Sequence, residues 1–158
     1  PYERSSTTTD ILLPDWAVAD KRAGVKQAAI NQQARQKLKR DILSKLEADG
    51  WHSLAHVKLA AGGKEWIGKT LAEVPVPAAT FDQQIENLIE VSLRGGTQAI
   101  YSDMNETDVA EAVSDEFCVF GSDSAVRDPN GDYRPHPRGS GTFPRIFARY
   151  VRENGRLS

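Results

Sequence analysis

The chain has 158 residues, 39% of them hydrophobic and 27% charged, which is enough for one domain with a sizeable core. Its formal net charge of −2 lacks the basic surplus that neutralises phosphates, so we expect no nucleic-acid partner. No apolar run approaches the ~20 residues that span a bilayer, so we expect no membrane partner either. The single cysteine, Cys118, excludes an intrachain disulfide and fits a cytoplasmic protein.

The first half of the chain is expected to be mostly helical. Residues 1–9 are expected to hold the end of a strand and a loop rich in hydroxyl groups. Apolar residues recur at helical spacing over residues 21–49, and Gly50 marks the expected end of that helix. The opposite face of this helix carries many Lys and Arg residues, which we interpret as a solvated face rather than a site for membranes or anions. Alternation over residues 54–60 then predicts a short strand.

Helices and strands are expected to alternate in the second half. Thr70 and Glu73 have the spacing of a capping box, which predicts a short helix that ends before Pro75. Further helices are expected over residues 81–93, 108–113 and 143–151, and strands over residues 99–101 and 117–120. Alternation of this kind favours parallel βα units. A barrel of eight parallel strands needs roughly 200 residues or more, so the chain could hold only part of one.

Gly63–Thr70 matches the nucleotide-binding pattern G-x-x-x-x-G-K-[ST]. In such a loop, backbone N–H groups surround the phosphates at the N-terminus of a helix. Here Glu65 would place a carboxylate beside the phosphates, and Pro75 would cut the following helix short. A nucleotide-binding module is therefore an alternative function that these residues disfavour.

The chain lacks the ligand pattern of a catalytic metal site. Zinc in enzymes is usually held by three protein side chains, with one coordination position left open. The histidines His52, His56 and His136 form neither a His-x-His pair nor a His-Glu-x-x-His motif. We therefore predict no metal ligands within these residues.

Asp123 and Arg138 are the candidate chemical groups of the chain. The apolar run that ends at Phe120 predicts a strand, and Asp123 would follow its carboxyl end, where parallel α/β folds carry their chemistry. A long polar loop follows and returns Arg138 toward the same edge. On pattern alone, Asp123 could instead be a turn or helix-cap residue, and Arg138 could form a surface salt bridge.

Several short motifs occur in an informative order. They are Gly121-Ser122-Asp123, His136-Pro137-Arg138, Gly141–Arg145 and Arg149–Glu153, supported by Pro1-Tyr2, Ser5-Ser6-Thr7, Leu13–Ala17 and Gly50-Trp51. In this order, over nearly the whole chain, they resemble the N-acyl-D-amino-acid deacylases (D-aminoacylases) of the amidohydrolase superfamily. Ser124 and Ser140 depart from residues common in that family, a glycine and an aromatic residue respectively.

The resemblance implies a metal-dependent hydrolase that acts on N-acyl-D-amino acids. In such enzymes a zinc-bound water attacks the amide, and the zinc ligands would precede Pro1 in a longer parent chain. The aspartate of the eighth barrel strand falls on Asp123, with the implied role of general base and then general acid. The substrate-binding arginine falls on Arg138, which would pair with the substrate carboxylate. Ser6 would hydrogen-bond the same carboxylate.

The resemblance also implies a fold class and its division. The chain would be an α/β fragment of a (β/α)8 barrel, with strands seven and eight and an inserted, mostly helical lid. Residues 1–9 would be the end of strand seven and its loop, residues 10–78 the lid, and residues 79–158 the last βα units. The implied partners are the substrate, zinc as cofactor of the parent enzyme, and the remainder of the barrel. We expect the isolated chain to be inactive, and a non-catalytic α/β module is a third alternative.

Overall fold

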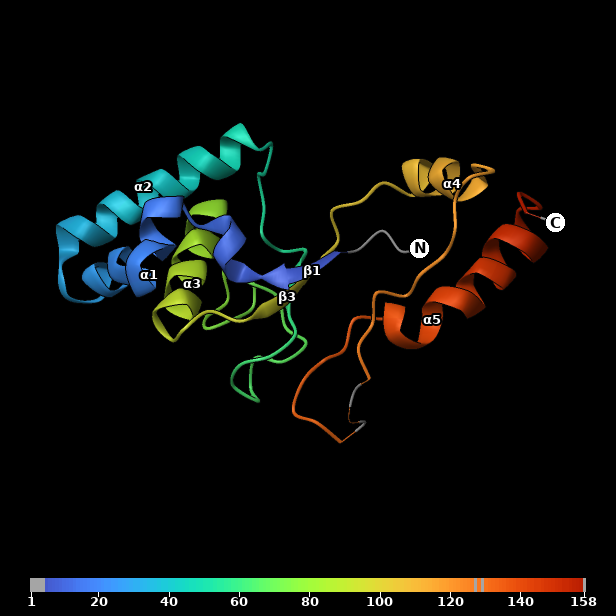
Figure 1. Ribbon diagram of the computed structural model, residues 1–158. Helices are drawn as coiled ribbons and strands as arrows, with labels where there is room; N and C mark the ends of the chain where they lie inside the picture. The colour runs from blue at the N-terminus through green and yellow to red at the C-terminus, as the bar shows by residue number, and fades with distance from the viewer. Residues whose placement is uncertain (1–4, 127, 129, 158) are drawn as a thin grey trace.

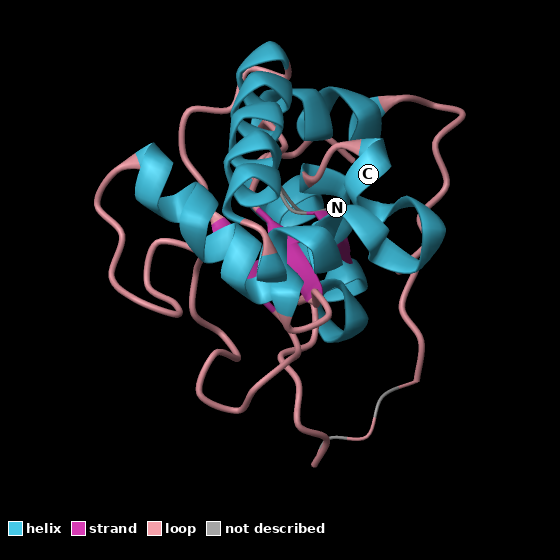
Figure 2. Ribbon diagram, turned by 90° about the vertical axis from the view of Figure 1, so that its left-hand side faces the viewer, coloured by secondary structure: helices cyan, strands magenta, loops and turns pink. Residues whose placement is uncertain are grey.

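The computed structural model describes residues 5–126, 128 and 130–157, and it has an α/β architecture (Figure 1). The elements in chain order are β1 (Ser5–Thr8), a 3-10 helix (Thr9–Leu12), α1 (Asp15–Ile30), α2 (Gln32–Ala48), β2 (Val57–Leu59), α3 (Phe81–Leu93), β3 (Gln98–Tyr101), α4 (Glu106–Ser114), α5 (Arg138–Arg145) and the π-helix η2 (Ile146–Glu153). Figure 2 shows the strands at the centre among the helices, with long loops extending away from them.

The described strands form one sheet in the order β1-β3-β2, and both pairings are antiparallel. This differs from the parallel pairing that the helix–strand alternation predicts. The alternation was a poor guide because β3 pairs with strands from both the start and the middle of the chain. Membership of a larger barrel sheet is not tested by this pairing, so the barrel fragment stays a prediction.

The two faces of the sheet have different surroundings. Val57, Leu59, Ala99 and Tyr101 are fully buried in the main hydrophobic core. Lys58 and Ile100 alternate with them, so they lie on the opposite face of the pleated sheet. The helices therefore cover one face of the sheet, and the other face carries the buried Ile100 and the half-buried Lys58.

Helices α1, α2 and α3 share the main core with the sheet. Leu38, Ile42 and Leu46 of α2 are buried at helical spacing, as are Ile85 and Leu88 of α3. α3 and β3 therefore pack in the same core as α1 and α2 in this structure. The division of the chain at residue 79 stays a prediction about the parent barrel.

Charged side chains tie α2 to α3 along their exposed edge. Arg35 contacts Glu86 at 2.8 Å and Glu90 at 2.7 Å, and Lys39 contacts Glu86 at 2.8 Å. Burial alone would raise the pKa of Glu86, but hydrogen bonds from Lys39 and Arg35 outweigh it and the pKa is lowered. Arg35 and Lys39 therefore join two helices of the fold, which the prediction of a solvated face did not include.

The predicted helix over residues 21–49 is two helices. Asn31 ends α1 with an extended backbone, and its side chain accepts a hydrogen bond from the amide of Ala34 at 3.0 Å, which caps α2. Gly50 follows α2 with φ +79, a conformation that favours glycine, so its predicted role as the stop is confirmed. The periodicity could not reveal the break because Asn31 interrupts only one position of the pattern.

Two other predicted elements are wrong. Thr70 does meet Glu73, whose carboxylate accepts from the Thr70 amide at 2.7 Å, but residues 71–73 form a turn rather than a helix. Residues 117–120 form no strand, and Phe117 and Val119 are 86% and 90% exposed. Asp115 accepts hydrogen bonds from the amides of Phe117 and Cys118, and such a local turn competes with strand pairing.

The C-terminal part of the chain has its own small core. Val109 and Val113 of α4 pack against the buried Tyr150 of η2. Glu106 lies above this core and accepts hydrogen bonds from Tyr150 at 2.7 Å and from Arg145 at 3.0 Å. Burial and the hydrogen bond to Glu106 raise the pKa of Tyr150. In Figure 1, α4 and α5 accordingly stand apart from α1 to α3.

Candidate functional site

A cavity of about 1030 Å³ lies between the face of the sheet opposite the main core and the loop that leads to α5. Lys58 and Ile100 from the sheet line it, and they are direct partners in the β2–β3 register. From the loop, Ser122, Ser124 and the segment Tyr133–Pro137 line it. This volume is at the upper end of the range that small-molecule sites occupy.

Ser6, a predicted substrate ligand, belongs to the same row of the sheet. Its backbone pairs with Ile100 in the β1–β3 register, and Ile100 pairs in turn with Lys58. The side chain of Ser6 lies outside the part of the chain that the structure describes. Its role toward a carboxylate therefore stays a prediction.

The loop is fixed to the sheet by the chain itself. The Arg134 amide donates a hydrogen bond to the Ala60 carbonyl at 2.7 Å, one residue beyond the end of β2. On the exposed side, Lys64 contacts Asp132 at 2.9 Å. A backbone hydrogen bond of this kind holds the loop over the cavity where an exposed ion pair alone would contribute little.

Asp123 and Arg138 are brought together. The Arg138 guanidinium Nη1 lies 3.1 Å from Asp123 Oδ2, and the two side chains are 28% and 87% exposed. Neither side chain lines the cavity, but Ser122 and Ser124 beside Asp123, and Pro137 and Gly139 beside Arg138, all do. The candidate pair thus sits at the rim of the cavity rather than within it.

Backbone geometry at Asp123 is unusual. Its φ of +48 lies in the left-handed region, which few residues other than glycine adopt. Arg138 begins α5, and its amide donates a hydrogen bond to His136 Nδ1 at 3.0 Å. Both residues therefore occupy defined positions, and strained backbone conformations often occur at functional sites.

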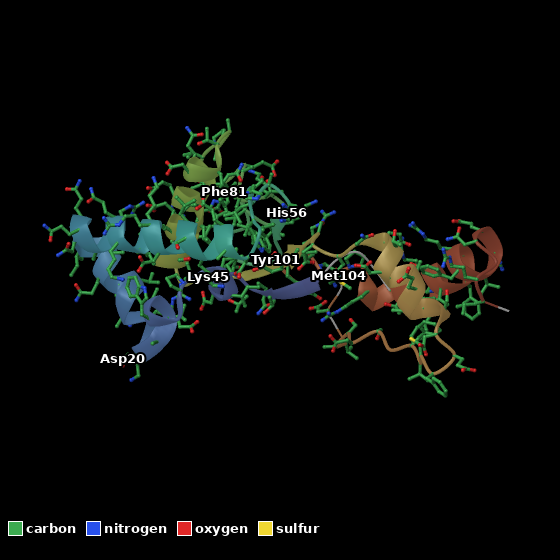
Figure 3. All side chains as sticks on the ribbon, turned by 90° about the horizontal axis from the view of Figure 1, so that it is seen from above. Asp20, Lys45, His56, Phe81, Tyr101 and Met104 are labelled. Atoms are coloured by element: carbon green, nitrogen blue, oxygen red, sulfur yellow. The ribbon has the colours of Figure 1, made fainter. Side chains whose placement is uncertain are left out.

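His56 is a lining residue that the sequence did not single out for binding. Its ring stacks on Trp51 with 4.9 Å between ring centres, and Figure 3 shows it beside Tyr101, near the middle of the molecule. Burial lowers the pKa of His56, against the opposing effect of Asp103. The position of His56 in the cavity lining, stacked on Trp51, follows from the fold and not from a motif in the sequence.

The lowered pKa of His56 predicts a pH dependence of stability. As pH falls below about 6.5, the ordinary histidine pKa, the unfolded chain takes up this proton before the folded chain does. The contribution of His56 to the free energy of unfolding is therefore full above that pH and is lost as pH falls through the folded pKa. Urea denaturation between pH 5 and 8, run on the wild type and on His56→Gln, measures it. We expect a shallower loss of stability in His56→Gln, and equal slopes would contradict the assignment.

Gly63–Thr70 does not form a phosphate-binding loop. The Gly68 amide donates to the Leu59 carbonyl at 2.8 Å, and the Lys69 amide donates to the Trp66 carbonyl at 3.0 Å, so these donors are used. Trp66 is buried in the main core, and a turn rather than a helix follows Thr70. Several amides of the segment are therefore already used, and the helix N-terminus that phosphates need is lacking.

We expect no specific binding of ATP or GTP at Gly63–Thr70. Calorimetry with the magnesium nucleotide should give no more heat for the wild type than for Lys69→Ala, whose altered side chain is exposed. Micromolar binding that Lys69→Ala abolishes would restore the nucleotide-binding alternative.

Within residues 5–126, 128 and 130–157, no three His, Cys, Asp or Glu side chains gather where one metal ion could contact them all. The donors there do not fit a zinc site by themselves. None of the helices in these ranges combines the length and the apolar character that crossing a bilayer requires.

One curated relative matches part of the chain. An N-acyl-D-glutamate deacylase of Alcaligenes xylosoxydans xylosoxydans is 47% identical over 55 residues, which are 35% of this chain and 10% of the relative. No family profile and no solved structure matches the chain. The partial match supports a relationship to a hydrolase and, at most, to the amidohydrolase family.

Proposed function

We propose that the chain is a fragment of an enzyme that deacylates N-acyl-D-amino acids, with Asp123 as the proton-transferring group. The observation that carries this proposal is the contact between Asp123 and Arg138 at the rim of the large cavity. The partial identity to an N-acyl-D-glutamate deacylase adds support from an independent direction. The relative is far longer than the matched stretch, so activity belongs to the whole parent protein.

In this proposal the two residues have complementary tasks. The Arg138 guanidinium binds the carboxylate of the N-acyl-D-amino acid, because a guanidinium and a carboxylate can form two parallel charge-assisted hydrogen bonds. The Asp123 carboxylate accepts a proton from the attacking water and returns it to the leaving amine, as general base and then general acid. Its side chain is 87% exposed, so a substrate can reach it. The products are a carboxylate and a free D-amino acid.

The zinc that this kind of enzyme uses would be held outside the described residues, which contain no fitting ligand group. Bound there, zinc would supply Lewis-acid activation of the substrate and water. This yields a prediction for the isolated chain. After dialysis, elemental analysis should find well under one zinc per chain, and the chain should hydrolyse no N-acyl-D-amino acid. One tightly bound zinc with turnover would contradict the fragment proposal.

Exposed apolar side chains in the C-terminal part of the chain support the proposal that another part of the parent protein packs there. Phe117, Val119, Phe143 and Phe147 are all at least 50% exposed, and together they belong to the segments that would close a barrel. Large apolar side chains exposed in one region commonly mark a surface that another part of a protein covers. We propose that the remainder of the parent barrel packs here.

Exchange of the matched segment tests the proposal. The 55 matched residues of the Alcaligenes deacylase would be replaced by those of this chain, and hydrolysis of N-acetyl-D-glutamate would be measured. A folded chimera that keeps most of the relative's activity is the expected result. A chimera with the relative's melting transition and metal content, but no activity, would contradict the proposal.

A further inference from the structure

The cavity has a charge distribution that differs from that of the whole chain. The chain contains 22 acidic and 20 basic residues, yet among the described residues no aspartate or glutamate lines the cavity, and Asp123 reaches only its rim. Lys58 and Arg134 line it, together with His56 and His136 and several hydroxyl groups. A cleft lined by charges of one sign concentrates their electric field, because its walls have a low dielectric constant. A cavity lined by cations therefore favours an anion.

Lys58 is fixed on the floor of the cavity. It lies in β2, opposite Ile100, and its backbone also bridges to Thr70, another lining residue. The nearby carboxylate of Glu73 is already held by the Thr70 amide at 2.7 Å and by the Thr70 hydroxyl at 2.9 Å. Among the described residues, no carboxylate forms an ion pair with Lys58. Hydrogen bonds from Thr70, and to a smaller extent the charge of Lys58, lower the pKa of the Glu73 carboxyl, and the Lys58 ammonium group forms no ion pair with a described carboxylate that would exclude a second anion.

Arg134 is held on the wall of the cavity. Its amide bonds to Ala60, and its side chain packs against Gly68, where φ +83 brings the backbone close. Ala60 is two residues beyond Lys58, so the same strand end positions both cations. Within the part of the chain that the structure describes, Arg134 has no carboxylate as an ion-pair partner.

We infer that Lys58 and Arg134 form a second carboxylate site, separate from Arg138. The assignment of a substrate to this carboxylate site rests on the proposed function. Arg138 at the rim would bind the carboxylate next to the amide, and the cavity would receive an acidic side chain. The chemical class is thus an N-acyl-D-amino acid with two carboxylates. Arg134 is exposed and Lys58 is half-buried, so an acidic side chain is favoured by the added attraction of two cations.

The site itself can be tested on the 158-residue chain with glutarate as the probe. Backbone amide shifts by NMR would report binding, with neutral glutaramide as the comparison ligand. We expect Lys58→Gln and Arg134→Gln each to weaken glutarate binding by about tenfold, the scale of one charge-assisted hydrogen bond. Lys21→Gln is the matched control, because Lys21 is an exposed lysine of α1 that does not line the cavity.

Several results would overturn the proposed carboxylate site. No glutarate binding, equal binding of glutaramide, or equal weakening by all three variants would overturn the inference. Loss on Arg138→Gln with no effect of Lys58→Gln would also overturn it, because the probe would then occupy the rim. In the parent enzyme, Lys58→Gln should reduce kcat/KM for N-acetyl-D-glutamate about tenfold more than for N-acetyl-D-leucine. Glutarate binding without any deacylation by the parent would instead refute the proposed function and leave the cavity site standing.

Discussion

Asp123→Asn in the parent enzyme is expected to lower kcat by about 10²–10⁴-fold, the usual contribution of a general acid–base group. Asparagine keeps the shape of the side chain and tolerates the left-handed backbone that Asp123 adopts at φ +48. It cannot accept a proton, and Asp123 would transfer protons twice in each turnover. Steady-state kinetics with N-acetyl-D-glutamate, with metal content and circular dichroism measured in parallel, checks this.

Asp132→Asn provides a matched control for that experiment. Asp132 lies in the same loop, is 66% exposed and pairs with Lys64, and neither residue lines the cavity, so its loss should leave kcat within about twofold. If Asp123→Asn keeps more than about a tenth of kcat with metal bound and the fold intact, Asp123 is not the proton-transferring group.

Arg138→Ala in the parent enzyme is expected to act mainly on substrate binding. Loss of the guanidinium removes a charge-assisted contact with the substrate carboxylate, which should raise KM and reduce kcat/KM by about 2–5 kcal/mol of transition-state stabilisation. Arg138→Lys should recover part of the loss, because a lysine keeps the charge and loses the paired geometry. Initial rates over a range of substrate concentrations separate KM from kcat.

Two observations make this experiment specific to Arg138. Added guanidinium should partly restore Arg138→Ala and should do nothing for Asp123→Asn. Arg152→Ala removes another arginine, one that is exposed near the end of η2, and should leave KM unchanged. An unchanged KM in Arg138→Ala would show that the substrate carboxylate binds elsewhere.

Much of the helical body could be predicted from the sequence. Helix α3 occupies the predicted residues 81–93, because its apolar side chains recur at helical spacing and Thr80 caps it. Strand β3 likewise includes the predicted residues 99–101. Such elements are determined locally, by periodicity and by caps, so they need no knowledge of the rest of the fold.

The strand over residues 117–120 could not be judged in the same way. Alternating apolar residues at Phe117 and Val119 suit a strand only if another strand lies beside them, and pairing is a property of the whole fold. In this structure Asp115 instead draws the segment into a turn. The apolar pattern of residues 117–120 does not distinguish a paired strand from a turn.

Two residues of the candidate site could be singled out from the sequence, and the lining of the cavity could not. The motifs around Asp123 and Arg138 identified both side chains, and the structure brings them within 3.1 Å of each other. The cavity depends on which face of the sheet the helices do not cover, so its lining by Lys58 and Arg134 had no local signal. A lysine between buried strand residues is a weak hint by itself, because solvated lysines are common.

The most direct test of the account is the rate of amide hydrolysis by the full-length parent protein with paired enantiomers. N-acetyl-D-glutamate and N-acetyl-L-glutamate would be compared at equal concentration, with release of free glutamate as the readout. We expect turnover of the D-enantiomer, a loss of that turnover by about 10²–10⁴-fold in Asp123→Asn, and little turnover of the L-enantiomer. Metal-loaded, folded parent protein that releases no D-amino acid from acidic or apolar N-acyl substrates would contradict it.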